Sequence, residues 1–131
     1  MKQECIEKNR NSHIKCEENK RKIIFINKKK ILVEKIIVDN CAITQGVRCD
    51  FLVKYLDLEN FIELKGEDLK HAFEQIQRSI KILSSNKKIV SYIITSRSPL
   101  SAAEIQNKRL QFKRKLNSEL IVKNNSIEVE I

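Results

Sequence analysis

Two acidic residues and a lysine stand at spacings that suit phosphoryl chemistry. Asp50 precedes Glu63 by 13 positions, and Lys65 follows Glu63 by two. In a strand, side chains alternate between faces, so Glu63 and Lys65 share one face while Ile62 and Leu64 share the other. Carboxylates held opposite each other on paired strands repel and need a cation. Mg²⁺ or Mn²⁺ suits this role because hard cations take oxygen ligands.

The chemistry expected of such a site is hydrolysis of a phosphodiester bond. A bound divalent cation polarises the scissile phosphate and lowers the pKa of a bound water. The ammonium of Lys65 adds positive charge where the pentacovalent phosphate builds negative charge. Arg48, Lys70, His71 and Arg97 are candidates for binding the phosphate backbone of a nucleic acid.

Strands must position these residues, and four are predicted in the first half of the chain from Ile- and Val-rich or alternating runs. They span residues 22–26, 31–38, 47–56 and 60–65. We expect the first two to form a hairpin across a polar turn. We expect the last two, joined at 57–59, to form an antiparallel pair that holds Asp50 and Glu63 at comparable heights.

The second half of the chain predicts two helices among further strands. Glu67 and Asp68 open a helix whose apolar positions recur every three or four residues up to Leu83, and which ends near residues 84–86. After the break at Pro99, a capping box predicts a second helix, from residue 101 to about 116. Residues 89–95 read as an interior strand, and residues 120–123 and 127–131 as a closing hairpin.

This order of elements predicts an α/β (α+β) domain with a mixed β-sheet of about five strands flanked by helices. Residues 1–20 read as a charged N-terminal arm or helix, and residues 21–131 as one domain. With only 131 residues, the chain has room for a single domain of ordinary size.

Asp50, then Glu63-x-Lys65 on the next strand, followed by a helix, resembles the PD-(D/E)XK nuclease superfamily. The resemblance covers roughly residues 31–97 and implies a restriction-endonuclease-like fold. It implies that Asp50 and Glu63 are metal ligands, together with the backbone carbonyl of Leu64. It also implies that Lys65 orients or activates the attacking water, and that Gln75 completes the site.

The sequence departs from that pattern in several places. Cys49 stands where the name-giving motif has proline, and Ser79 stands where the subgroup with a Gln-x-x-x-Tyr motif has tyrosine. Many members carry a further acidic residue on a helix before the first strand, for which no spacing selects one candidate. The candidates for that role are Glu17, Glu18 and Glu34. Asp39, at the end of the second predicted strand, is a candidate for a further carboxylate near the site.

Composition limits the partners and the location. The 26 basic and 17 acidic residues give a net charge of +9, which favours a polyanionic partner, although a Lys-rich composition alone could produce it. The two glycines are too few for a dinucleotide-binding fingerprint. Four cysteines without a C-x-x-C pair indicate reduced thiols. No signal peptide or membrane-spanning run is visible, so we expect a cytoplasmic protein.

The sequence as a whole predicts a Mg²⁺- or Mn²⁺-dependent nuclease acting on DNA, or less readily on RNA. Because the chain has no room for a separate recognition domain, we expect it to be guided by nucleic-acid structure, to form a homodimer or to need a partner protein. The alternative is a non-catalytic nucleic-acid-binding or protein-interaction module on the same fold, whose positive surface meets a nucleic acid or an acidic protein.

Overall fold

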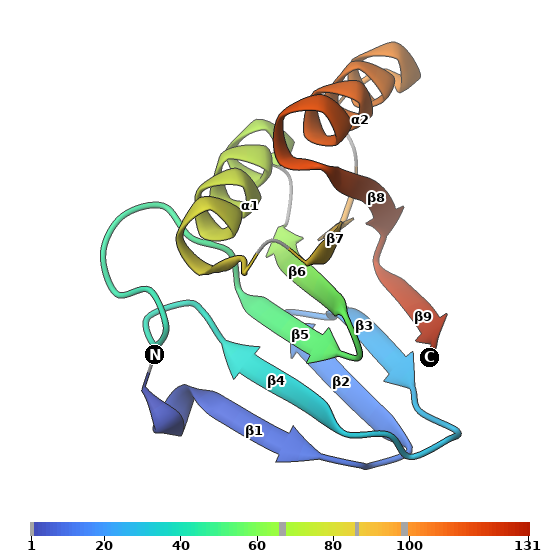
Figure 1. Ribbon diagram of the computed structural model, residues 1–131. Helices are drawn as coiled ribbons and strands as arrows, with labels where there is room; N and C mark the ends of the chain where they lie inside the picture. The colour runs from blue at the N-terminus through green and yellow to red at the C-terminus, as the bar shows by residue number, and fades with distance from the viewer. Residues whose placement is uncertain (1, 66–67, 86, 98–99) are drawn as a thin grey trace.

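Two β-sheets and two helices make up the computed structural model, which describes residues 2–65, 68–85, 87–97 and 100–131 (Figure 1). The six-stranded sheet has the order β1 (Ile6–Asn9), β4 (Val33–Ile37), β5 (Phe51–Tyr55), β6 (Leu58–Lys65), β7 (Lys88–Thr95) and β8 (Ser118–Asn124). The three-stranded sheet has the order β2 (His13–Glu18), β3 (Arg21–Ile26) and β9 (Ser126–Glu130). The helices are α1 (Leu69–Leu83) and α2 (Ala102–Leu116).

The six-stranded sheet is mixed. Strands β1, β4, β5 and β6 pair antiparallel, whereas β6, β7 and β8 pair parallel. Parallel neighbours need a crossover, and α1 links β6 to β7 while α2 links β7 to β8. The α+β fold class and the two helical crossovers are therefore confirmed. The mixed sheet has six strands where about five were predicted, and the separate three-stranded sheet was not predicted.

The protein has three layers: the helices, the six-stranded sheet and the three-stranded sheet. Apolar clusters on the two faces of the six-stranded sheet hold the layers together. Both helices cover one face and strands β2 and β3 cover the other (Figure 1). Phe61 and Ile93 pack in the cluster beneath the helices, whereas Ile62 and Tyr92 pack against the three-stranded sheet. Alternation along β6 therefore puts Glu63, two residues after Phe61, on the face that the helices cover.

Local signals set the helix ends. The Asp68 side chain caps α1 by accepting a hydrogen bond from the backbone N–H of His71 at 3.1 Å. The predicted capping box is confirmed at α2, where Ser101 and Glu104 bond each other's backbone amides. Asn117 ends α2 in the left-handed conformation, with φ of 51°. The roles expected of Glu67, Pro99 and Asn86, and of Gly66 as the end of the fourth strand, lie outside the described residues.

The expected arm or helix over residues 1–20 is wrong in its secondary structure. After a short 3₁₀ turn, this segment forms β1 and β2, which pair with β4 and β3 respectively. In β2 the buried residues Ile14 and Cys16 alternate with exposed charged neighbours. Strand β2 was not predicted because only two apolar residues in this highly charged segment show the alternation that is typical of a strand.

The hairpins predicted over residues 22–38 and 120–131 do not form, because in each case the chain passes from one sheet to the other. Between β3 and β4, the buried Asn27 side chain bonds both the N–H and the C=O of Ile31, which turns the chain out of the three-stranded sheet. Between β8 and β9, the backbone of Asn125 donates to Thr95 and accepts from Lys22. Turn chemistry was predicted correctly at both places, but the strand partners were not.

A disulfide joins Cys5 to Cys41, with a Cα–Cα distance of 5.7 Å. The prediction of four reduced thiols is wrong for this pair, while Cys16 and Cys49 are buried free cysteines. The bond fastens the N-terminal turn before β1 to the loop after β4. Disulfides are characteristic of oxidising compartments and rare in the cytosol, so this bond gives no support to the expected cytoplasmic location.

None of the helices within the described residues is long and apolar enough to cross a membrane.

Candidate functional site

The β5–β6 hairpin brings Asp50 opposite Glu63, as expected from their spacing. Phe51 pairs with Ile62, and the backbone N–H of Asp50 donates to the Ile62 carbonyl at 3.0 Å. Asp50 therefore continues the register by one residue beyond the start of β5. The predicted strand over residues 47–56 begins too early, since β5 starts only at Phe51.

Residues 47–50 are not a strand because α1 binds their backbone. The side-chain amide of Gln75 donates to the Arg48 carbonyl at 3.0 Å. The Cys49 amide donates to the Ser79 hydroxyl at 2.8 Å, and this hydroxyl donates to the Gln75 carbonyl. One turn of α1 thus holds the segment that leads into Asp50. Ser79, which stands where the Gln-x-x-x-Tyr subgroup has tyrosine, has this positioning role.

Arg78 holds the preceding loop from the same helix. Its guanidinium donates to the carbonyls of Gln45 at 3.0 Å and Val47 at 2.7 Å. Gly46 lies between them with φ of +82°, and a Cβ there would lie 2.7 Å from the Arg78 guanidinium carbon. Glycine is needed here both for the left-handed backbone and for the space that Arg78 occupies.

The candidate metal ligands lie in direct contact. The side chains of Asp50 and Glu63 are within hydrogen-bond reach of each other, and Lys65 Nζ lies 3.6 Å from Glu63 Oε2. The backbone N–H of Leu64 donates to Asp50 Oδ2 at 2.8 Å. The structure therefore brings together the three residues on which the sequence hypothesis depends. The Leu64 carbonyl as a metal ligand stays a prediction.

Glu63 is a buried acid with an unpaired oxygen. Its side chain is 2% exposed, and Glu63 Oε1 has no hydrogen-bond partner among the described residues. Burial and, second to it, the Asp50 charge raise the pKa of Glu63 to about 9, although the Lys65 ammonium opposes both. Glu63 thus holds its proton at neutral pH unless a cation replaces that proton.

Asp50 is perturbed in the same direction but less strongly. Burial raises the pKa of Asp50 to about 6, against the stabilising hydrogen bond from the Leu64 amide. The charges of Glu18 and Asp39 contribute to this rise of the Asp50 pKa. Of the acidic residues considered as additional carboxylates, these two therefore lie near enough to act on the site. Glu18 does so from β2 rather than from a helix.

A cavity of about 380 Å³ opens beside Asp50. It lies between the 39–50 segment and the first turns of α1, and several of the residues predicted for the site line it together. The lining residues are Asp39, Gly46, Val47, Arg48, Asp50, His71 and Gln75. Gln75 Oε1 is buried and has no hydrogen-bond partner among the described residues, so a polar group of the helix is available to a ligand in or beside this cavity.

The predicted phosphate-binding residues are dispersed. Arg48 forms an ion pair with Asp39 at 2.8 Å and also donates to the Gly46 carbonyl, so its guanidinium is already engaged. His71 lies at the cavity and contacts Glu74 at 3.8 Å. Lys70 and Arg97 are exposed and do not line it.

The donor set fits a divalent cation in part. Two carboxyl groups in contact, one with an unpartnered oxygen, are what a Mg²⁺ or Mn²⁺ ion would neutralise, and Mg²⁺ sites often use only one or two carboxylates with substrate and water oxygens. No group of three or more His, Cys, Asp or Glu side chains suited to a metal occurs in the described part of the chain. Further ligands would have to come from backbone, water or substrate.

Sequence reasoning missed one well-satisfied buried acid. Glu59 is fully buried at the start of β6 and accepts hydrogen bonds from the hydroxyls of Ser84 and Ser85 and from the Ser85 backbone amide. It ties the end of α1 to the sheet, so its role is structural. Two consecutive serines after an amphipathic helix were the only sequence signal for it.

Comparison of the chain with models of known families, with curated proteins and with solved structures finds no match. The resemblance to PD-(D/E)XK nucleases therefore depends on the residues and geometry described above.

Proposed function

We propose that this protein is a metal-dependent nuclease that hydrolyses phosphodiester bonds through Asp50, Glu63 and Lys65. The observation that carries the proposal is the contact between the buried Glu63 and the half-buried Asp50, two carboxyl groups of raised pKa, with the Lys65 ammonium 3.6 Å from Glu63. Acids with perturbed pKa values are typical of functional sites, and Asp50 lines a cavity, although Glu63 and Lys65 do not. In a purely structural pair we would expect both oxygens of Glu63 to have hydrogen-bond partners, whereas Oε1 has none among the described residues.

The chain's own residues have distinct parts in this proposal. Asp50 and Glu63 would hold Mg²⁺ or Mn²⁺, which supplies Lewis acidity and lowers the pKa of water at the phosphate. Lys65 would stabilise charge on the phosphate or orient the attacking water. The Leu64 amide fixes the Asp50 carboxylate through its 2.8 Å hydrogen bond. Gln75 would offer its free Oε1 to the same ligand.

The proposed substrate is a nucleic acid, and the superfamily resemblance favours DNA over RNA. The net charge of +9 supports a polyanion. His71 at the cavity and the exposed Lys70 and Arg97 would contact the phosphate backbone. A homodimer or a partner protein would supply the substrate selection.

Cleavage assays on matched variants test the proposal. Purified protein is incubated with Mn²⁺ or Mg²⁺ and labelled single-stranded DNA, duplex DNA, branched DNA and RNA. We expect cleavage of at least one substrate, lost on chelation and reduced by at least about a hundredfold in Glu63→Gln and Asp50→Asn. Lys65→Met should reduce cleavage while sparing metal binding.

Asp57→Asn is the control, because Asp57 is an exposed acid in the same hairpin, 98% accessible at its side chain. It should cleave like the wild type. Intact substrates under every condition would contradict the nuclease proposal. So would cleavage that Glu63→Gln and Asp50→Asn leave unchanged, since the activity would then arise elsewhere.

A non-catalytic nucleic-acid-binding module is the second candidate, and one observation favours it. Lys65 already lies within ion-pair distance of Glu63, so a cation of the chain itself neutralises part of the site. Salt-sensitive DNA binding that chelation leaves unchanged, without cleavage, would identify this function.

A further inference from the structure

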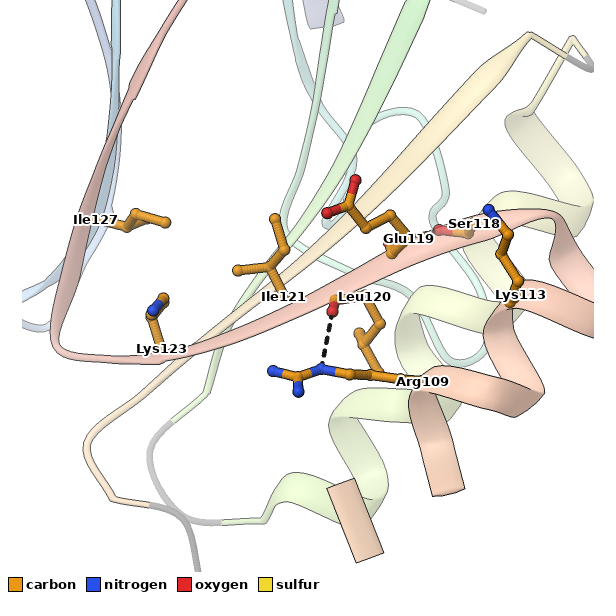
Figure 2. A pocket seen from close by; sticks show the side chains of 8 residues that line it. All are labelled: Arg109, Lys113, Ser118, Glu119, Leu120, Ile121, Lys123 and Ile127. Carbon is orange, nitrogen blue, oxygen red and sulfur yellow. Dashed lines mark hydrogen bonds between the residues drawn. The ribbon is translucent and has the colours of Figure 1, made fainter. Parts of the chain in front are cut away.

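Strand β8 forms one edge of the six-stranded sheet, and β1 forms the other (Figure 1). Among the described strands of that sheet, β8 pairs only with β7. A cavity of about 530 Å³ runs along this edge between α2 and the start of β9 (Figure 2). It is separate from the cavity beside Asp50, with which it shares no lining residue. The lining residues are Arg109, Lys113, Ser118, Glu119, Leu120, Ile121, Lys123 and Ile127.

The edge presents backbone groups that could pair with another strand. The Leu120 carbonyl points away from β7, since it accepts a hydrogen bond at 3.3 Å from Arg109 of α2, drawn in Figure 2. Backbone direction alternates along a strand, so the N–H and C=O of Val122 share this outward direction. An edge of this kind is a template for β-pairing. The Arg109 bond need not break, because a carbonyl has two acceptor sites.

The charge around this edge selects the partner. Arg109, Lys113 and Lys123 face the cavity against one acidic residue, Glu119 (Figure 2). Within the described residues none of these four side chains forms an ion pair. Beside these charged side chains, the half-buried side chains of Ile121 and Ile127 provide apolar surface in the cavity.

We propose that β8 and its flanking cations bind an extended acidic peptide segment, which adds to the six-stranded sheet as a further strand. The free backbone row would give affinity, and the alternating side chains of the peptide would give specificity. Acidic positions would meet Arg109, Lys113 and Lys123, and apolar positions would pack on Ile121 and Ile127. The seven residues of β8 match a peptide of about that length.

Two other occupants fit less well. A second copy of this chain would place a second set of the same three cations against the first, which is repulsive. A nucleic-acid strand matches the cations but has no alternating N–H and C=O groups for the strand edge. Cations on an edge strand also protect it from pairing with most other strands. An acidic strand is attracted rather than repelled by these cations, so it remains a suitable partner. The proposal is independent of the nuclease proposal.

Binding of a synthetic probe tests the inference. The probe is a fluorescent, end-blocked heptapeptide of alternating glutamate and valine, followed by anisotropy at low salt with the full-length protein. We expect saturable binding that weakens as salt is added. Arg109→Glu combined with Lys123→Glu should weaken binding about tenfold or more, because two exposed ion pairs become repulsions. Lys8→Glu, on β1 at the opposite edge, should leave binding unchanged.

The backbone part of the proposal has its own readouts. The same peptide with N-methyl groups on alternate residues, in both registers, should bind at least about tenfold more weakly, because it lacks half of its donors. In hydrogen exchange, saturation with the unmodified peptide should slow the Leu120 and Val122 amides about tenfold or more. The odd-numbered amides of β8 already face β7 and should change little.

Three results would overturn the inference. The first is no binding of the acidic peptide, or binding equal to that of a lysine–valine peptide. The second is peptide binding without protection at Leu120 and Val122, which would place the peptide elsewhere. The third is protection of these amides without peptide, either in a concentration-dependent dimer or on adding a dodecamer of thymidylate, which would assign the edge to a second copy or to nucleic acid.

Discussion

Glu63 binds its proton more tightly in the folded chain than in the unfolded chain, because burial raises its pKa from 4.5 to about 9. The favourable contribution of the protonated group is complete below the unfolded pKa and is lost as the pH rises toward the folded one. The free energy of unfolding of the metal-free protein should therefore fall between about pH 4.5 and 9, with a slope of up to about 1.4 kcal/mol per pH unit from this group.

Glu63→Gln isolates this effect, since the amide stays neutral at every pH. Urea unfolding in the presence of a chelator, at about pH 5 and about pH 8.5, should show the variant gaining stability relative to the wild type at the higher pH. The mild rise of the Asp50 pKa to about 6 acts in the same direction within a lower window. An equal stability difference at both pH values would contradict the assignment of Glu63 as a buried, protonated acid.

We expect the contact between Asp50 and Glu63 to make the response to metal depend on pH. A cation that occupies the pair must replace the proton held by Glu63, so affinity should rise with pH. A fixed concentration of Mn²⁺, about 100 times its Kd at pH 8, should add about 2.7 kcal/mol to the free energy of unfolding at pH 8. The same concentration should add less at pH 6. Thermal unfolding with and without chelator measures this.

Glu63→Gln should remove the response to Mn²⁺, and Asp57→Asn should retain it. A metal effect that is the same in all three proteins would show that the cation binds elsewhere on the chain.

At the scale of elements, α1 and the 45–49 loop act as one unit that positions Asp50. Gly46→Ala places a methyl group 2.7 Å from the Arg78 guanidinium and forces a left-handed φ of +82° on alanine. We expect a loss of about 1–2 kcal/mol in the free energy of unfolding from the backbone alone, and more from the displaced Arg78. Chemical denaturation measures both.

A double-mutant cycle separates these causes. In an Arg78→Ala background the steric conflict is gone, so Gly46→Ala should cost less there than in the wild type. Costs that simply add would mean that Arg78 does not occupy the space beside Gly46.

The elements that local patterns describe were predictable from sequence. The apolar stripe of α1, the Ser101 capping box and the Asp50–Glu63 pairing each depend on residues that are close in sequence or joined by a short hairpin. The start of β5 was not predictable, because hydrogen bonds from α1, including that of Ser79 with Cys49, decide it. A helix 30 residues away has no signature in the strand itself.

Long-range pairing was the other part that sequence did not reveal. Strands β8 and β9 follow each other across the polar residues 124–126, which favoured a hairpin, yet the two strands join different sheets. Which strand lies beside β3 is decided by the packing of the second apolar cluster as a whole. The Cys5–Cys41 bond likewise depends on the pairing of β1 with β4, which no cysteine spacing encodes.

At the scale of the whole molecule, this disulfide should contribute substantially to stability. It closes a loop with a sequence separation of 36 residues, for which the chain-entropy treatment gives about 4 kcal/mol. Reductant should therefore lower the unfolding midpoint of the wild type. The double variant Cys5→Ser/Cys41→Ser should have the lower midpoint already and should not respond to reductant. A wild type that is indifferent to reductant would contradict a formed bond.

The parallel pairing of β3 with β9 has a consequence for the way this chain is made. A ribosome delivers β3 early and β9 only after both helices and the whole six-stranded sheet have been synthesised. Until then, one edge of β3 and the apolar side chains that Ile127 and Val129 later pack against stay uncovered on the nascent chain. Such edges invite aggregation. Productive folding should therefore be a late event, and the need for chaperones greatest just before β9 emerges.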